Sequence, residues 1–360
     1  MRLFVIAGKA TDSVLDGFLP AADRLGLDVT VLTDRPGQYP GRAVIACDVS
    51  DFREIVQHGR PDAYFSNGDF LQTPTALAAE FYGLPGKDWK ATLRCKNKSL
   101  MRRHLGDVWA SPFPVPDDAP YPLVVKPREG VASEDVVLVR TPSELAALPD
   151  TGRPMVAEEY LRGSLHTLET LNGRVLGSFA TTLSPEPYFI EERLDWAQPP
   201  PETPQVLAAL DALGVGFGAC HTEFVVHEGR ARIIEVNYRI IGDHCDFLLA
   251  ELLGRDVFAD VLLTHLGQPV AFEPVPSGAA TVDYLVADRS GTLTAAPAPG
   301  TVVDRGVSVT YRPQRNIGDV IIQTNTNRDY LGTVQFVGPD RASVDAAVTR
   351  FRRARTWAVD

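Results

Sequence analysis

Residues 220–239 read CHTEFVVHEGRARIIEVNYR, two β-rich runs separated by a turn that contains Gly229. A three-residue loop around Gly229 pairs Glu223 directly with Glu235 and leaves Asn237 on the same face of the hairpin. Two carboxylates that face each other across a ladder repel and need a compensating charge. Because a set of two glutamates and one asparagine offers only oxygen ligands, it favours Mg²⁺ over Zn²⁺. The hairpin therefore predicts a magnesium site formed by Glu223, Glu235 and Asn237, with Mn²⁺ as an alternative metal.

The register of this hairpin decides whether the metal site exists. With the three-residue loop, the polar face also pairs His221 with Asn237 and Val225 with Ile233. The opposite face is apolar and is expected to pack on the core; it carries Phe224, Val226, Ile234 and Val236. A two-residue loop would shift the pairing by one residue and place the two glutamates on opposite faces. The competing interpretation of the hairpin is an exposed polar face that carries one unfavourable like-charge pair.

The first 90 residues have the pattern of a parallel α/β domain. Segments with helical spacing alternate with short apolar runs at residues 3–7, 29–32, 43–47 and 63–66. Neither G-x-G-x-x-G nor G-x-x-x-x-G-K-[S/T] occurs in the chain, so the usual dinucleotide and P-loop signatures are missing. We expect a nucleotide-binding-like domain without its glycine fingerprint.

A proline-rich segment, SPFPVPDDAPYP (111–122), introduces a different pattern of strand, glycine loop and strand. Two more strands, near 168–171 and 175–181, complete a small α+β unit. Beyond this unit the spacing predicts helices at 206–213, 245–253 and 343–353. The expected division of the chain is an N-terminal α/β domain (1–90), a linker helix with a lid subdomain (91–182), and a catalytic subdomain with the metal hairpin and tail (183–360).

Composition limits the class of protein. The chain has 360 residues, of which 44% are hydrophobic and 22% charged, as in ordinary globular proteins. Its formal net charge of −11 argues against nucleic acid and anionic membranes as partners, but allows a local site for a phosphorylated ligand. The widely spaced cysteines, the short N-terminal apolar run and the lack of a long apolar segment predict a cytoplasmic protein. A homodimer is a reasonable hypothesis.

Glu223 with Glu235-Val-Asn237-Tyr-Arg239 resembles the E…E-x-N-x-R pattern that ends the ATP site of the ATP-grasp superfamily. Four more segments resemble family features and follow in the family's order: KNKSLMRRHL (96–105), YPLVVKP (121–127), REGVASEDV (128–136) and MVAEEYLRG (155–163). The resemblance covers roughly residues 90–270. It implies an ATP-grasp fold, mixed α/β and α+β, with an N-terminal Rossmann-like domain, a small lid subdomain and a C-terminal antiparallel-sheet domain.

The resemblance also implies nucleotide contacts. Lys98 and Lys126 would neutralise the phosphates of ATP. The loop that contains Gly130 and Ser133 would close over them, because its small residues let backbone N–H groups approach anions. The hinge strand would contact adenine through Glu158, Glu159, Tyr160 and Leu161.

Two features depart from the family pattern. Many relatives bind the ribose with a glutamate at a position that Leu165 occupies here. His166 stands next, and biotin-carboxylase-like members use a histidine at this point, so His166 is assigned the ribose role. The phosphate loop is also poorer in glycine than in many relatives.

The implied reaction is ATP-dependent ligation of a carboxylate to an amine. The carboxylate attacks the γ-phosphate, and the amine then displaces phosphate from the acylphosphate. Lys126 and Arg239 would be the catalytic residues, and Arg239 would bind the acylphosphate or the substrate carboxylate with its planar guanidinium. The chain most resembles single-chain ligases that join amino acids, and GSLHTLETL (163–171) resembles ligases of siderophore assembly.

The segment RIIGDHCDF (239–247) follows the metal strand, where relatives build the acceptor pocket. Candidate substrate contacts here are Gly242, Asp243, His244 and Asp246. Either aspartate would meet a substrate ammonium, and the histidine would help to deprotonate an amine. The alternative for these residues is capping of the helix that starts at CDFLLAELL. The acid and amine substrates are small molecules whose identity this segment leaves open.

Three other functions are compatible with the motifs. One is a biotin-carboxylase-like or purine-pathway ATP-grasp enzyme. Another is a non-catalytic ATP-binding regulatory protein, although such a sensor has no need of Arg239 beside the metal. The third is an α/β carbohydrate-binding or transferase protein in which the paired glutamates are accidental. Magnesium-dependent ATP binding would separate the third from the others.

Overall fold

The N-terminal part of the chain is a parallel α/β domain, as predicted. The computed structural model describes residues 1–271, 278–354 and 356–360. The domain's sheet has the strand order β3-β2-β1-β4 and consists of β1 (Arg2–Ile6), β2 (Asp28–Thr33), β3 (Ala43–Ala46) and β4 (Ala63–Phe65). Its main helices are α1 (Leu19–Arg24), α2 (Phe52–Val56) and α3 (Gln72–Phe81). Strand β1 and its neighbour β4 are almost fully buried, which explains their continuous apolar runs.

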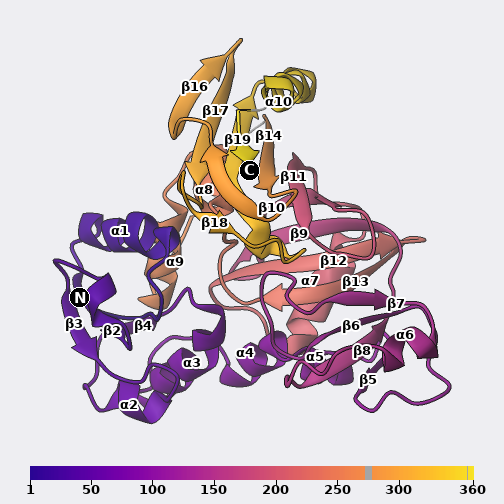
Figure 1. The fold of residues 1–360 in the computed structure, drawn as a ribbon. Coiled ribbons are helices and arrows are strands. Elements are labelled where there is room, and N and C mark those ends of the chain that lie inside the picture. The colour runs from indigo at the N-terminus through magenta and orange to yellow at the C-terminus, as the bar shows by residue number, and fades with distance from the viewer. Residues whose placement is uncertain (272–277, 355) are drawn as a thin grey trace.

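Two consecutive helices, α4 (Trp89–Lys96) and α5 (Lys98–Leu105), lead from this domain towards the lid. They run along the lower edge of the large sheet in Figure 1. Between them, the Asn97 side chain caps α5 by accepting a hydrogen bond from the Leu100 N–H at 3.1 Å. This cap makes Lys98 the first helical residue and places Arg102 one turn later on the same face.

The lid is a four-stranded antiparallel sheet in the order β5-β8-β6-β7. Its strands are β5 (Ala110–Pro112), β6 (Leu123–Pro127), β7 (Val137–Val139) and β8 (Met155–Glu159), with helix α6 (Pro142–Ala146) between β7 and β8. A small apolar core of its own holds this sheet together; it includes Leu123, Val125, Val139 and Ala157. The lid therefore packs independently of the larger sheet.

The largest element is a nine-stranded sheet in the order β13-β12-β9-β10-β11-β14-β19-β17-β16. Its first half comprises β9 (Ser164–Leu171), β10 (Arg174–Leu183), β11 (Glu191–Ala197), β12 (Ala219–His227) and β13 (Arg230–Asn237). Strands β9 and β10 thus belong to this sheet and not to the lid unit, where the sequence interpretation placed them. The boundary drawn between residues 182 and 183 cuts through the large sheet, because β10 pairs with β11.

The β12–β13 hairpin keeps the predicted pairing of Glu223 with Glu235, but reaches it in a different way. The turn has two residues, Glu228 and Gly229, which both have positive φ, of 49° and 72°. By itself this turn would place the glutamates out of register. A β-bulge restores the pairing, because the register shifts between Glu223 and Phe224 and leaves Ile234 as an extra residue on β13.

The bulge also corrects the predicted faces of the hairpin. Phe224 pairs with Ile233, and both are buried in the core. Val225 pairs with Arg232 instead of Ile233. Ile234, predicted to face the core, lines the cavity described below.

The C-terminal part extends the large sheet and covers it with helices. The added strands are β14 (Ala279–Val286), β16 (Gly300–Asp304), β17 (Val307–Pro313) and β19 (Tyr330–Gly338). A three-stranded sheet packs beside them, formed by β15 (Gly291–Ala295), β18 (Val320–Ile321) and β20 (Ala358–Val359). The remaining helices are α7 (Thr203–Leu213), α8 (Cys245–Leu253), α9 (Val257–His265) and α10 (Arg341–Ala354), which confirms the three predicted here. Within the described ranges, no helix has the length and apolarity needed to span a bilayer.

Candidate active site

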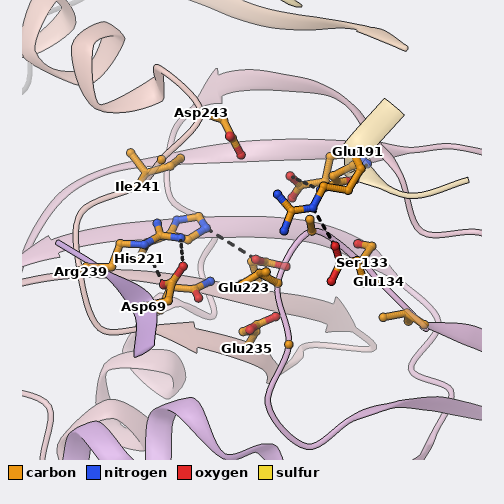
Figure 2. Close-up of a pocket in the computed structure, with 18 of the residues that line it drawn as sticks. Asp69, Ser133, Glu134, Glu191, His221, Glu223, Glu235, Arg239, Ile241 and Asp243 are labelled. Carbon is orange, nitrogen blue, oxygen red and sulfur yellow. Dashed lines mark hydrogen bonds and ion pairs between the residues drawn. The ribbon is translucent and has the colours of Figure 1, made fainter. Parts of the chain in front are cut away.

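One cavity of about 1090 Å³ lies where the N-terminal domain, the lid and the large sheet meet. The ends of the N-terminal strands, the lid strands with their loop, the hairpin and the segment after β13 all contribute to its wall. Figure 2 shows Glu223 and Glu235 near its centre, Arg239 and Asp69 on one side, and Ser133 and Glu134 on the other. The sequence motifs that are widely separated in the chain therefore converge on one space.

The facing glutamates are each paired with a cation of the protein. The Lys98 Nζ lies 2.8 Å from the Glu235 Oε1, and the His221 Nε2 lies 3.6 Å from the Glu223 Oε1. Burial alone would raise the pKa of Glu235, but Lys98 and the other nearby lysines hold it below its ordinary value. Protein cations thus compensate part of the like-charge repulsion, which the hairpin sequence alone did not reveal.

His221 is itself fixed by a buried glutamate on the neighbouring strand. Its Nδ1 lies 2.7 Å from the Oε1 of Glu169, which β9 brings directly opposite. Burial lowers the pKa of His221, but Glu169 and Glu223 outweigh it and raise the pKa to about 10. His221 therefore lies between the Glu169 and Glu223 carboxylates, and both favour its protonated form.

Glu223, Glu235 and Asn237 have the donor chemistry of a Mg²⁺ site that a phosphate completes. All three line the cavity from one face of the hairpin. Across the described part of the chain, no three His, Cys, Asp or Glu residues gather as a complete metal site. Mg²⁺ commonly takes one or two carboxylates from the protein and the rest of its ligands from phosphates and water. The residues present fit that arrangement.

The lid lysine belongs to a buried triad. Glu158 accepts from the Lys126 Nζ at 2.7 Å and from the Arg102 Nη2 at 2.9 Å, and all three side chains are buried. Burial raises the pKa of Glu158, but Arg102 and Lys126 outweigh it and lower the pKa to about 2. Burial also lowers the pKa of the Lys126 amine, against the effect of Glu158. These two cations hold the Glu158 carboxylate through its Oε2, and the adenine contact expected of this residue stays a prediction.

The rest of the hinge forms one wall of the cavity, although its polar atoms are largely engaged. The Glu159 carboxylate accepts from the Trp109 N–H at 3.0 Å, and the Tyr160 hydroxyl donates to the Glu186 Oε1 at 2.9 Å. Leu161 also lines the cavity. Further apolar side chains of this wall are Val124, Leu183, Val225 and Ile234. This end of the cavity therefore forms an apolar slot, lined by these side chains, in which a flat ring can pack.

His166 does not lie where a ribose contact requires it. On β9, Leu165 lines the cavity, and its neighbour His166 is not among the described residues that do so. The His166 ring stacks on Phe224 at 5.7 Å, and its Nε2 contacts the Ser164 Oγ at 3.0 Å. Because alternate residues of a strand point to opposite faces, a cavity-facing Leu165 turns His166 away. We therefore withdraw the ribose assignment.

The phosphate loop is held in a strained conformation. Ala132, Ser133 and Asp135 have φ values of 59°, 54° and 56°, a region that residues other than glycine rarely adopt. The Ser133 Oγ donates to the Phe189 carbonyl at 2.9 Å, and the Asn327 N–H donates to the Ala132 carbonyl at 3.0 Å. Gly130 and Ser133 both line the cavity, as predicted. Contacts with the β10–β11 connection and with the C-terminal part thus hold the loop over the site.

The segment after β13 forms the cavity wall beside the hairpin. Gly242, Asp243 and His244 line the cavity. The His244 Nε2 lies 2.6 Å from the Asp12 Oδ2, and Asp243 and His244 have positive φ values of 52° and 65°.

Asp246 is fully buried outside the cavity lining, where its carboxylate accepts from the Phe247 N–H at 3.0 Å. Burial raises the pKa of Asp246 to about 6, and its position excludes direct contact with a substrate in this structure.

No family model matches the chain. The curated, uncharacterized protein y4rH of Sinorhizobium fredii (strain NBRC 101917 / NGR234) is 28% identical over 415 residues, covering 100% of this chain and 84% of the relative. The crystal structure of the L-amino acid ligase from Bacillus licheniformis matches with a TM-score of 0.80 at 24% identity, covering 100% of this chain and 98% of that chain. The chain has the ATP-grasp fold.

A second ATP-grasp structure shows what this fold holds in another protein. The biotin carboxylase domain of the Hydrogenobacter thermophilus 2-oxoglutarate carboxylase, solved with MgADP and bicarbonate, matches with a TM-score of 0.67 at 15% identity. The match covers 99% of this chain and 90% of that chain. The predicted fold class is confirmed by these matches.

Several residues at or behind the cavity wall were missed by the sequence interpretation. Asp12, Asp69 and Glu191 line the cavity, while Arg102 and Glu169 pair with the cavity residues Glu158 and His221. Two had usable signals: Arg102 is one helical turn after Lys98, and Asp69 follows the last strand of a parallel sheet, where ligands commonly bind. No sequence pattern pointed to Glu191. In the structure, burial and the nearby Glu223 raise the pKa of its carboxyl group to about 8.

Proposed function

We propose that the chain is an ATP- and magnesium-dependent carboxylate–amine ligase that forms an amide bond through an acylphosphate and releases ADP and phosphate. The observation that carries the proposal is the convergence, in one cavity of an ATP-grasp fold, of the facing carboxylates with Asn237, Lys126 and Arg239. This set provides oxygen ligands for a metal, a cation for the phosphates, and a guanidinium for the reacting carboxylate.

Each group of cavity residues has its own role in the proposed phosphoryl transfer, set by its position. Lys98 and Lys126 neutralise the phosphate chain, and the apolar slot at Leu161 holds the adenine ring. Glu223, Glu235 and Asn237 would hold Mg²⁺, which would supply positive charge to neutralise the phosphates when bound. Arg239 holds the substrate carboxylate, whose oxygen attacks the γ-phosphorus as the bond to ADP breaks, and then binds the acylphosphate. An amine attacks the acyl carbon, the C–O bond to phosphate breaks, and the amine proton passes to the released phosphate or to water.

The substrates we propose are a small amino acid or polycarboxylic acid and a small amine, in the biosynthesis of peptide- or siderophore-like metabolites. The match to an L-amino acid ligase over the whole chain supports the amino-acid class. Asp243 and His244 line the cavity beside Arg239, where an amine substrate would approach.

A product assay tests this function directly. The protein is incubated with Mg-ATP and pooled candidate acids and amines, and ADP, AMP and phosphate are measured. We expect ADP and phosphate to appear only when a particular acid and amine are both present. AMP and pyrophosphate would show adenylation and refute the acylphosphate route. Magnesium-dependent ATP binding without turnover in any pool would favour a non-catalytic ATP-binding protein.

Lys126→Ala is expected to weaken MgATP binding by roughly 10- to 100-fold, because it removes one charge-assisted phosphate contact. Arg102 still pairs with Glu158 in this variant, so the buried carboxylate keeps one partner. Isothermal titration calorimetry measures the affinity. Lys90→Ala, on an exposed position of α4, is the matched control and should bind as the wild type does. Unchanged affinity in Lys126→Ala would remove this lysine from the phosphate site.

A further inference from the structure

The N-terminal domain holds the two residues that follow the metal ligand Asn237. Tyr238 and Arg239 lie at the end of β13, where the chain leaves the hairpin. Arg239 contacts Asp69 in the segment that connects β4 to α3, and Lys87 links the Tyr238 carbonyl to Gln72, the first residue of α3. These contacts join parts of the chain that are more than 150 residues apart.

The first contact is an ion pair inside the cavity. The Arg239 Nε donates to the Asp69 Oδ1 at 2.9 Å, and the Nη2 donates to the Asp69 Oδ2 at 3.2 Å. The Nη1 donates to the carbonyl of Ile240 at 2.8 Å. Both side chains are largely buried, with 16% and 18% of their area exposed, and both line the cavity. Each of the three guanidinium nitrogens therefore donates one hydrogen bond to the protein, which fixes the plane of the group and leaves two of its five N–H donors for a ligand.

The second contact fixes the backbone just before Arg239. The buried Lys87 Nζ donates to the carbonyl of Tyr238 and, at 2.6 Å, to the Gln72 Oε1. The Gln72 amide nitrogen in turn donates to the carbonyls of Ser66 and Gly68, at 3.0 and 2.9 Å. These bonds tie the turn that carries Asp69 to the end of β13. The same domain thus holds both the backbone and the side chain of the arginine.

We propose that Asp69 is a positioning residue of the ligase reaction, through which the N-terminal domain sets the orientation of the Arg239 guanidinium towards the transferring phosphoryl group. The inference rests on the proposed function and adds a part of the chain that no ATP-site motif contains. Arg239 has a long side chain with several freely rotating bonds, and only a fixed fork binds a carboxylate or phosphate in a defined plane. Because a displacement of about 1 Å at a reacting group can cost about 10²-fold in rate, loss of this pair should slow the chemistry.

Asp69→Asn tests the proposal with a change that preserves shape. We expect the rate of ADP formation at saturating substrates to fall by about 10²-fold, and the MgATP dissociation constant to stay within about twofold of the wild type. Asp69→Glu restores the negative charge and should recover part of the lost rate. Asp23→Asn is the matched control, because Asp23 forms a similar two-bond pair with Arg42 on the surface of the same domain, outside the cavity lining.

A double-mutant cycle separates positioning from a general structural role. In an Arg239→Ala background, Asp69→Asn should cause little further loss, because Asp69 acts through the guanidinium. Multiplicative losses in the double variant, or a wild-type rate in Asp69→Asn, would overturn the proposal while leaving the ligase function intact.

A binding measurement tests the positioning role of Asp69 without a known substrate. Mg-ADP with aluminium fluoride mimics the transferring phosphoryl group, and the dissociation rate of the trapped ADP is the readout. We expect the wild type to retain the complex and Asp69→Asn to release it at least tenfold faster, with ADP binding in the absence of fluoride unchanged. Equal release from both proteins, or no trapping by the wild type, would refute the positioning role even if the product assay shows no ligase.

Discussion

Glu235→Gln is expected to slow ADP formation by roughly 10²- to 10³-fold, the range measured when one preorganised electrostatic group is removed from an active site. Glu235 contributes one of the two carboxylates that face each other on the hairpin, and its Oε1 accepts from the Lys98 Nζ at 2.8 Å. The amide keeps the shape of the side chain and loses the charge that a divalent cation needs. Steady-state ADP release across a range of Mg²⁺ concentrations measures the effect.

The same variant should also be less stable without metal. Lys98 is buried, and the substitution leaves its ammonium without a carboxylate partner, a loss of about 1–3 kcal/mol of unfolding free energy. Urea unfolding in the presence of EDTA measures it. Glu228→Gln, in the exposed turn of the same hairpin, should change neither stability nor rate. A rate within tenfold of the wild type at saturating Mg²⁺ would show that Glu235 is not a metal ligand.

Glu158→Gln is expected to lower the free energy of unfolding by about 3–5 kcal/mol, the cost of breaking a buried ion pair by removing one partner. The carboxylate lies between the Lys126 Nζ and the Arg102 Nη2, and both cations would stay buried without it. Chemical denaturation at neutral pH measures the loss. Glu186→Gln, which removes the exposed pair with Arg140, is the control and should cost no more than about 1 kcal/mol.

The pH dependence of stability provides a second measurement of the triad. The pKa of Glu158 falls from its ordinary value of 4.5 in the unfolded chain to about 2 in the folded protein. A lowered pKa contributes stability that is present above pH 4.5 and is lost as the pH falls towards 2, a contribution on the order of 3 kcal/mol. The wild type should therefore lose stability more steeply than Glu158→Gln over this range. Parallel profiles would show that Glu158 does not titrate differently in the folded protein.

Local patterns were enough to predict the metal ligands and the phosphate lysines that we propose. Glu223, Glu235 and Asn237 lie on one hairpin, and their spacing follows from the alternation of a strand. The predicted pairing of Glu223 with Glu235 is correct, but the predicted three-residue turn is not. The turn has two residues, and the bulge at Ile234 restores the register. Bulges depend on how the whole sheet twists and packs, so a hairpin sequence alone does not report them.

The sequence by itself was enough to identify the ATP-grasp fold, because five segments that resemble motifs of this superfamily follow in the superfamily's order. Only the tertiary structure decided the partners of the charged groups. Glu235 pairs with Lys98 across 137 residues, and Arg239 pairs with Asp69 across 170 residues. Likewise, nothing in the sequence pattern indicated that Glu158 pairs with both Arg102 and Lys126. Ion pairs of this kind form between groups that folding brings together and buries, and no periodicity along the chain records which carboxylate will meet which cation.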